Sequence, residues 1–311
     1  MDALTVRNNN EITTRFNENF YAEWISYIDV KEKSRQTYER AIRQFKNWLD
    51  RKGITQPTRA DILSFREELK ATSKPSTVQA YIMAVRLFFS FLEQQGLYPN
   101  IADKIKGARV TADHKEDYLS VNQARNLLNT VDRTTVQGKR DYAILCLMLT
   151  SGLRTVEVVR ANREDISIVN DTPVLYIQGK GKEERTTYTK LEPHTEQAIQ
   201  DYLRAVGPAK GTAPLFISFA NKNAGERLTT RSVSRLAKTH LIKSGLNSPR
   251  ITAHSLRHTT AVTNLRNGAT LEETQQLMRH TNINTTMVYL NNLSREQNNS
   301  ETRVGKVLFS V

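Results

Sequence analysis

Two short segments in the second half of the chain carry side chains that could hold a phosphate. The first contains Arg154 and, three residues later, Glu157. The second contains His254 and Arg257, whose spacing places both on one face of a helix. No carboxylate lies near this second pair in the sequence, so the two would make a poor structural ion pair. They suit a phosphate better, because a guanidinium offers forked donors to two oxygens and an imidazole adds a donor or a proton.

A zinc site is the alternative for the second segment. His254 and His258 stand four residues apart, the spacing of two zinc ligands on a helix. The zinc-protease pattern, however, needs a glutamate directly after the first histidine, and this chain has Ser255 there. No cysteine or carboxylate lies nearby to complete a site. We therefore predict no metal site, and we expect His258 to pack within its own domain.

Further residues could act on the same phosphate. Lys180 stands in Gly179-Lys180-Gly181, a predicted hairpin tip, and Lys182 lies two residues further on. His280 and Tyr289 follow nine residues apart near the carboxyl end. Each has an ordinary structural explanation when taken alone: a solvated turn lysine, a half-buried aromatic ring, or, for Arg154, a helix cap or a partner of Glu157.

The charge of the chain favours a polyanionic partner. The formal net charge is +13 and the isoelectric point is about 9.8. Residues 1–107 carry a net +4 and residues 108–311 a net +9, so the excess is not confined to a tail. Such a balance is typical of proteins that bind nucleic acid or an anionic membrane surface.

Length and composition exclude several classes of protein. With 311 residues and about 100–200 residues per domain, the chain should hold two domains. No apolar run approaches the roughly 18 residues of a membrane span, and Met1–Asn10 has no signal-peptide core. The single cysteine, Cys146, can form neither an internal disulfide nor a cysteine-based zinc site. We expect a cytoplasmic protein with no membrane association.

The first hundred residues have the apolar periodicity of four helices. Each stripe is wide enough to bury one face, so the economical packing is a helical bundle. Basic residues lie beside the second stripe and in the polar stretch after Pro99. This stretch leads into a predicted linker over residues 108–117. They are solvated side chains or contacts to a nucleic-acid backbone. These candidates are Arg40, Arg43, Lys46, Lys104, Lys106 and Arg109.

The second region mixes helices with a few strands. Residues 142–149 are apolar on every side, as in a central core helix. Three short segments, at 166–168, 174–177 and 185–189, alternate or cluster as strands do. The pattern from Pro193 onward is helical again. The predicted fold is mainly α with a small β-sheet.

The order of these residues resembles that of the tyrosine site-specific recombinases, the family of phage-type integrases and Xer recombinases. The resemblance covers most of the chain and implies a helical, SAM-like core-binding domain at 1–107 and a mixed α/β catalytic domain at 118–311. One departure is Arg279, where the family usually has glycine before the late histidine; it would alter local packing or add a DNA contact. The resemblance rests on Gly152-Leu153-Arg154 with Glu157, Gly179-Lys180-Gly181, His254-x-Leu-Arg257-His258, His280 and Thr285-Thr286-x-x-Tyr289.

The resemblance implies transesterification at a DNA phosphodiester without metal, ATP or any other cofactor. Tyr289 would attack phosphorus and give a 3′-phosphotyrosine and a free 5′-hydroxyl. Arg154 and Arg257, with His280, would stabilise the charge of the transition state. The remaining residues would support the reaction. Lys180 or Lys182 would protonate the leaving oxygen, His254 would assist proton transfer at the tyrosine, and Glu157 would orient the pocket.

The resemblance also implies an assembly. A homotetramer would hold two double-stranded DNA sites, with accessory proteins left open, and the apolar tail after Tyr289 would dock on a neighbouring protomer. The biological task would be integration and excision of a mobile element, Xer-like resolution, or inversion. Two rivals stay open: a DNA-binding or architectural protein without live chemistry, and a topoisomerase with the same nucleophile.

Overall fold

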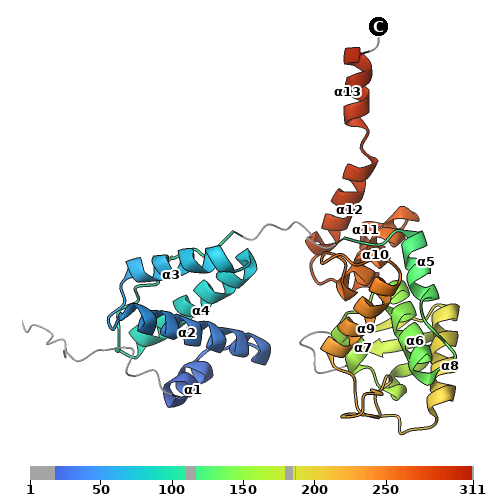
Figure 1. The fold of residues 1–311 in the computed structure, drawn as a ribbon, viewed down its shortest axis with the longest axis horizontal. Coiled ribbons are helices and arrows are strands. Elements are labelled where there is room, and N and C mark those ends of the chain that lie inside the picture. Colours follow the sequence, from blue (N-terminus) through green and yellow to red (C-terminus); the bar gives the residue numbers. More distant parts are fainter. Residues whose placement is uncertain (1–17, 110–116, 179–184, 186, 310–311) are drawn as a thin grey trace, which may run out of the picture. The chain divides into compact units, whose positions relative to one another are not determined.

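The computed structural model describes residues 18–109, 117–178, 185 and 187–309 (Figure 1). The chain divides into two compact units, residues 1–112 and 113–311. The described part confirms the predicted fold class, because it is mainly helical and holds one small sheet. In it, no helix combines the length and the apolar character needed to cross a bilayer.

In its described residues, 18–109, the first unit is built from four helices around an aromatic core. Local signals set their ends: Thr58 and Asp61 form a capping box, Pro75 opens the fourth helix, and Gly53 ends the second in the left-handed conformation. The apolar stripes meet in the interior, where the Phe45 and Phe65 rings lie 5.0 Å apart. The helices are α1 (Glu18–Tyr27), α2 (Glu32–Lys52), α3 (Arg59–Thr72) and α4 (Pro75–Gln94).

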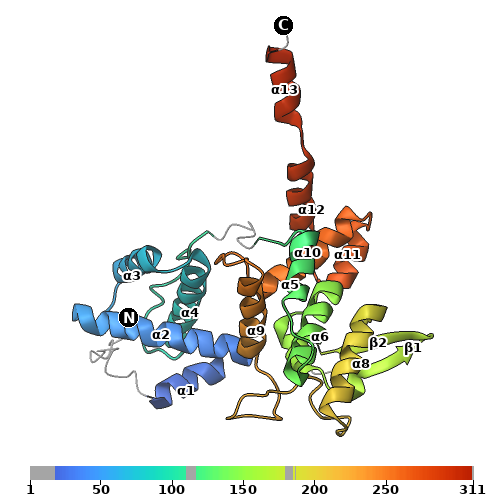
Figure 2. The same cartoon turned by 45° about the vertical axis from the view of Figure 1, so that its right-hand side comes forward.

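In the second unit the other elements pack around a central helix, α6 (Val136–Ser151). This helix lies beside α8 (Pro193–Val206) (Figure 2). Residues 143–148 of α6 are all buried, as the unbroken apolar run predicted. A helix that is apolar on every side has to be covered on every side. The other helices are α5 (Val121–Asn129), α7 (Thr155–Arg160), α9 (Thr230–Lys243), α10 (Ala253–Arg266), α11 (Leu271–Met278), α12 (Asn284–Gln297) and α13 (Ser300–Phe309).

The sheet of the second unit follows α7 and a 3₁₀ turn, η2 (Arg163–Asp165). Its strands, β1 (Ile166–Val169), β2 (Thr172–Ile177) and β3 (Thr187–Lys190), pair antiparallel in sequence order. The register places Leu175 opposite both Ile166 and Thr189. Because Leu175 and Ile177 are buried, one face of β2 packs on the core.

Candidate active site

The turn after α6 brings two distant parts of the second unit together. Gly152 ends α6 with φ 57° and ψ 33°, the left-handed conformation that glycine adopts most readily. A Cβ atom at this position would lie 2.9 Å from the Sδ atom of Met278, at the end of α11. Glycine is therefore required twice, once for the backbone and once for the close approach of α11.

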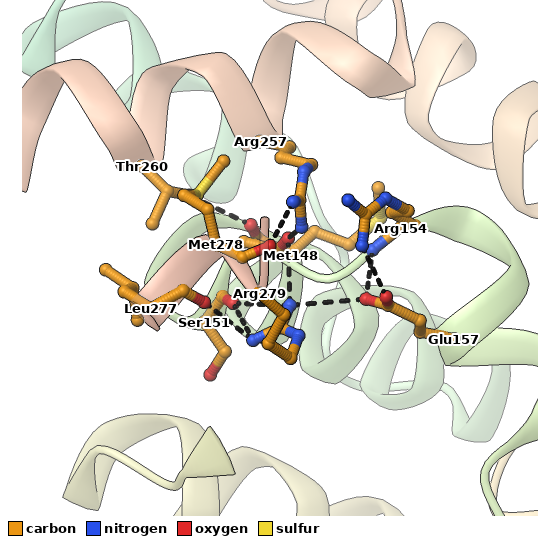
Figure 3. A network of polar contacts seen from close by, with 10 residues as sticks. Met148, Ser151, Arg154, Glu157, Arg257, Thr260, Leu277, Met278 and Arg279 are labelled. Atoms are coloured by element: carbon orange, nitrogen blue, oxygen red, sulfur yellow. Dashed lines mark hydrogen bonds and ion pairs between the residues drawn. The ribbon is translucent and has the colours of Figure 1, made fainter. Parts of the chain in front are cut away.

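Glu157 holds Arg154 in two ways. The Arg154 backbone N–H donates to Oε2 of Glu157 and its Nη1 donates to Oε1, both at 2.8 Å (Figure 3). The Arg154 side chain is 29% exposed, whereas that of Glu157 is 1% exposed. Burial alone would raise the pKa of Glu157, but Arg279 and Arg154 outweigh burial and lower it. Glu157 is thus an ionised carboxylate that both caps α7 and fixes the arginine.

Arg257 lies on α10 and is 1% exposed. It donates to the carbonyl oxygens of Gly152 and Met278, and so joins the α6–α7 turn to the end of α11 (Figure 3). Burial and then the neighbouring Arg154 lower the pKa of Arg257 to about 9, which leaves the group charged at neutral pH. Since both described partners are neutral carbonyls, the positive charge stays available to an anion.

Arg279 completes what we call the arginine cluster: Arg154, Arg257, Arg279 and the carboxylate of Glu157. Its guanidinium donates to Oε2 of Glu157 at 3.2 Å and its side chain is 11% exposed. Three guanidinium groups against one carboxylate leave the cluster with two uncompensated positive charges. Such an excess stabilises a bound phosphate, and still more the added charge of a pentacoordinate transition state.

His280 is the residue directly after Arg279 in the sequence, and its imidazole ring is neutral at neutral pH. Its Nδ1 lies 2.8 Å from the Oγ1 of Thr286, a residue that is fully buried. Burial, followed by the charges of Arg257 and Arg154, lowers the pKa of His280 to about 3. When the Thr286 hydroxyl donates to Nδ1, the hydrogen of the neutral ring sits on Nε2 and can be donated to a phosphate oxygen.

Tyr289, on α12, is 3% exposed and lies among histidine rings. Its ring is 5.1 Å from the ring of His258 and 6.3 Å from that of His280, with which it stacks at 10°. Tyr289 also acts on Arg257 electrostatically, since its charged form would raise the pKa of that arginine. The tyrosine and the arginine cluster therefore share one site within one unit.

His254 is the exposed member of a row of rings that also contains His258, Tyr289 and His280. It is exposed at the start of α10, and its ring meets that of His258 edge-on at 4.6 Å. His258 is buried, as expected from the sequence. His254 and Arg257 thus share a helix but differ in exposure. Among the described residues, no group of three histidine, cysteine, aspartate or glutamate side chains could hold a metal.

The other predicted site residues fall in three groups. Lys180 and Lys182 lie outside the described residues. Two of the proposed DNA contacts on α2 are partly buried and paired: Arg43 with Glu39 at 2.8 Å, and Lys46 with Asp50 at 2.6 Å. The remaining candidates are exposed, with Lys104 3.7 Å from the carboxylate of Asp103: Arg40, Lys104, Lys106 and Arg109.

The sequence analysis named Thr286 and Arg279 but did not predict the contacts that they make in the site. The hydroxyl of Thr286 orients His280, and its signal was present in the pair Thr285-Thr286 three residues before the tyrosine. The inward orientation of the Arg279 side chain had a weaker signal in the sequence. It is a long basic side chain directly after a helix end, where it can reach carbonyl groups.

The fold is a helical unit followed by a mixed unit in which arginine, histidine and tyrosine side chains share one site, and comparison with known proteins identifies the family. Residues 117–296 match the Phage integrase family, and residues 19–96 match the phage integrase N-terminal SAM-like domain. The chain belongs to the phage integrase family.

Curated relatives narrow the class. The tyrosine recombinase XerC of Chlamydia trachomatis serovar L2 is 34% identical over 227 residues, 72% of this chain and 69% of that protein. XerC of Chlamydia caviae is 30% identical over 298 residues, 87% of this chain and 93% of that protein. XerD of Lacticaseibacillus casei is 30% identical over 278 residues. The chain is a tyrosine recombinase, an enzyme of site-specific DNA recombination, and the reading as a non-catalytic binder is set aside.

Solved structures share the fold. The XerH recombinase in a post-cleavage complex with its palindromic difH substrate has a TM-score of 0.70 at 19% identity, covering 86% of this chain and 80% of that one. A lambda integrase dimer bound to a COC′ core site has a TM-score of 0.64 at 15% identity, covering 86% and 94%.

Proposed function

We propose that Tyr289 is the nucleophile of this recombinase and that Arg154 and Arg257 of the arginine cluster receive the scissile phosphate. The observation that carries the proposal is the burial of the Tyr289 ring against His258 and His280, within the electrostatic reach of Arg257. A tyrosine serving only the core would gain nothing from an excess of uncompensated charge beside it.

In the proposed reaction, the Tyr289 oxygen forms a bond to phosphorus while the bond from phosphorus to the 5′-oxygen breaks. His254 assists removal of the phenolic proton, and Lys180, or else Lys182, donates a proton to the leaving 5′-oxygen. Arg154, Arg257 and the Nε2–H of His280 stabilise the charge on the non-bridging oxygens. A second 5′-hydroxyl then reverses the step on a new strand. The phosphotyrosine conserves the bond energy, so the scheme needs neither ATP nor a metal.

A nicked suicide substrate tests this assignment. The wild-type chain should form a covalent protein–DNA band, and Tyr289→Phe should form none while still shifting DNA in a gel. Tyr142→Phe is the matched control, since Tyr142 lies on α6 near Cys146 rather than beside the arginine cluster. A covalent band that persists in Tyr289→Phe would assign the nucleophile to another residue.

We further propose that the helical unit and the catalytic unit divide the work. Residues 1–107 would bind DNA through Arg40, Lys104 and Lys106. Residues 108–117 would link the units and add Arg109 as a contact, and residues 118–311 would cut and rejoin. The exposure of these four side chains supports the proposal. Charge reversal of Arg40 should weaken binding of every sequence and flatten the salt dependence of the dissociation constant, whereas a base-reading residue would change sequence preference.

The proposed assembly is a homotetramer on two duplexes, in the cytoplasm where its DNA lies. A lambda integrase tetramer bound to a Holliday junction shares this fold. The exposed apolar side chains of α13 support docking on a second copy, since no residue of this helix is buried in the described part of the chain. Deleting residues 295–311 should abolish cooperative assembly on DNA and recombination; full assembly by the shortened chain would contradict the docking role. These side chains are Val304, Val307, Leu308 and Phe309.

A plasmid assay distinguishes the biological tasks and the topoisomerase reading. Two sites in direct repeat report resolution or excision, inverted sites report inversion, and sites on separate molecules report integration. Relaxation of a supercoiled plasmid that carries no site would indicate topoisomerase action.

A further inference from the structure

Arg279 occupies a backbone position that favours glycine. It ends α11 with φ 51° and ψ 46°, in the left-handed region that most side chains avoid. Such a residue persists only where its surroundings compensate for the strain, and these positions gather at functional sites. The contacts of the arginine side chain are therefore expected to offset the strain of its backbone.

The side chain turns inward and meets the end of α6. Its two terminal nitrogens donate to the carbonyl oxygen of Ser151 at 3.2 Å, and Nη2 also reaches that of Gly152 at 3.2 Å (Figure 3). Nη1 returns to the carbonyl of Leu277 at 2.7 Å. The last carbonyls of a helix have no partner within the helix, and a cation there is favourable. With 11% of its side chain exposed, Arg279 is engaged by protein rather than directed at DNA.

Arg279 shares a partner with each of the other two arginines. It shares the Gly152 carbonyl with Arg257 and the Glu157 carboxylate with Arg154. The residue directly after it is His280. The Arg279 guanidinium thus contacts the turn that carries Arg154, while its backbone is part of the turn that carries His280.

We propose that Arg279 is a positioning residue of the recombination site: it locks the Ser151–Arg154 turn to the Met278–His280 turn, and so sets the distance between Arg154 and His280 without touching DNA. This inference rests on the proposed roles of Arg154, His280 and Tyr289. It predicts that the loss of Arg279 harms the chemical step and leaves DNA binding intact.

Arg279→Gly is the sharp test, because glycine suits the backbone and only the side chain is lost. We expect single-turnover cleavage of the suicide substrate to fall about 10- to 100-fold, the range that misplaced catalytic groups produce. The dissociation constant for the same DNA should change less than about twofold, since no DNA contact is removed. Free guanidinium ion at millimolar concentration should restore part of the cleavage rate, which a merely altered backbone would not allow.

Asp171→Gly is the matched control. Asp171 also has a positive φ, 58°, but it is exposed in the β1–β2 turn, and the partners of the three arginines given above do not include it. The control should leave both cleavage and binding unchanged. Arg279→Gly protein that cleaves at the wild-type rate, or that loses binding as much as cleavage, would overturn the positioning role.

A second readout separates this inference from the proposed function. In a protein with isotopically labelled histidine and tyrosine, Arg279→Gly should shift the ring signals of His280 and Tyr289, and Asp171→Gly should not. If the wild type forms no covalent complex, the proposed chemistry fails, but the ring signals still report on positioning. Unchanged His280 and Tyr289 signals in Arg279→Gly would refute positioning even in a fully active enzyme.

Discussion

Gly152→Ala offers a quantitative test of how the site is assembled. The new methyl group meets two separate penalties at this position. The left-handed backbone, at φ 57°, destabilises a non-glycine residue by about 1–2 kcal/mol. The Cβ also approaches Met278 Sδ to 2.9 Å, and Met278 is fully buried, so relief needs repacking that costs about 1–3 kcal/mol. We expect a total loss of about 3 kcal/mol in the free energy of unfolding of the second unit.

Gly53→Ala isolates the first penalty. Gly53 ends α2 with φ 66° and ψ 26°, nearly the same backbone, but a Cβ there meets nothing within 4 Å. Its loss should be about 1 kcal/mol, in the unfolding of the first unit. Calorimetry of each variant, with each transition assigned to its unit, gives the comparison. For a unit of roughly 200 residues, 3 kcal/mol corresponds to about 6–12 °C in melting temperature.

The same change should reach the chemistry. The Gly152 carbonyl accepts from both Arg257 and Arg279, so a displaced turn moves two guanidinium groups at once. Covalent-complex formation should fall about tenfold or more in Gly152→Ala and stay at the wild-type level in Gly53→Ala. The reasoning is refuted if Gly152→Ala destabilises no more than Gly53→Ala, because the close approach of Met278 would then carry no weight.

Three further predictions concern titratable groups. Glu157→Gln removes the carboxylate that Arg154 and Arg279 share; we expect a loss of about 3–5 kcal/mol in the free energy of unfolding, measured by denaturant titration. His280 has a folded-state pKa near 3, below the ordinary 6.5, so the unfolded chain binds the proton first and stability should fall as the pH drops from about 6.5 toward 3. In His280→Asn this contribution should vanish, and histidine NMR titration checks the value. Burial raises the pKa of Cys146 to about 11, so a thiol reagent at pH 8 should label the native protein only at the rate of unfolding.

The sequence predicted the fold where burial follows a simple period. The apolar run at 142–149 and the four stripes of the first unit read directly as helices because each must bury a defined face. The tail was harder. Its apolar residues suggested docking but no structure, and it forms α13, a helix in which no residue is buried. Burial of an apolar face within the described chain therefore does not determine this helix, and periodicity alone cannot reveal that.

The site was predictable in its members and less so in its connections. Residue order brought together Arg154, Arg257, His280 and Tyr289, and the structure places all four in the second unit. The sequence could not show that Arg257 is buried while His254, three residues earlier, is exposed. Nor could it show that Arg279 shares Glu157 with Arg154, because that contact joins residues 122 positions apart. Long-range polar contacts of this kind depend on how the turns pack, not on spacing.

The end of α6 explains why structure and chemistry meet at the same arginines. Side-chain donors surround the carbonyl groups at this end: the Thr260 hydroxyl on α10 lies within hydrogen-bond distance of those of Met148 and Leu149, and the arginines donate to those of Ser151 and Gly152. Neutral donors would satisfy the carbonyls equally well, yet they would bring no charge. Guanidinium groups satisfy them and keep their positive charge, which Glu157 only partly neutralises. The negative end of the α6 dipole also makes it easier to bury these cations close together. A phosphate entering the site therefore meets cations already held in place by backbone groups, and their fixed positions are what an electrostatically stabilised transition state requires.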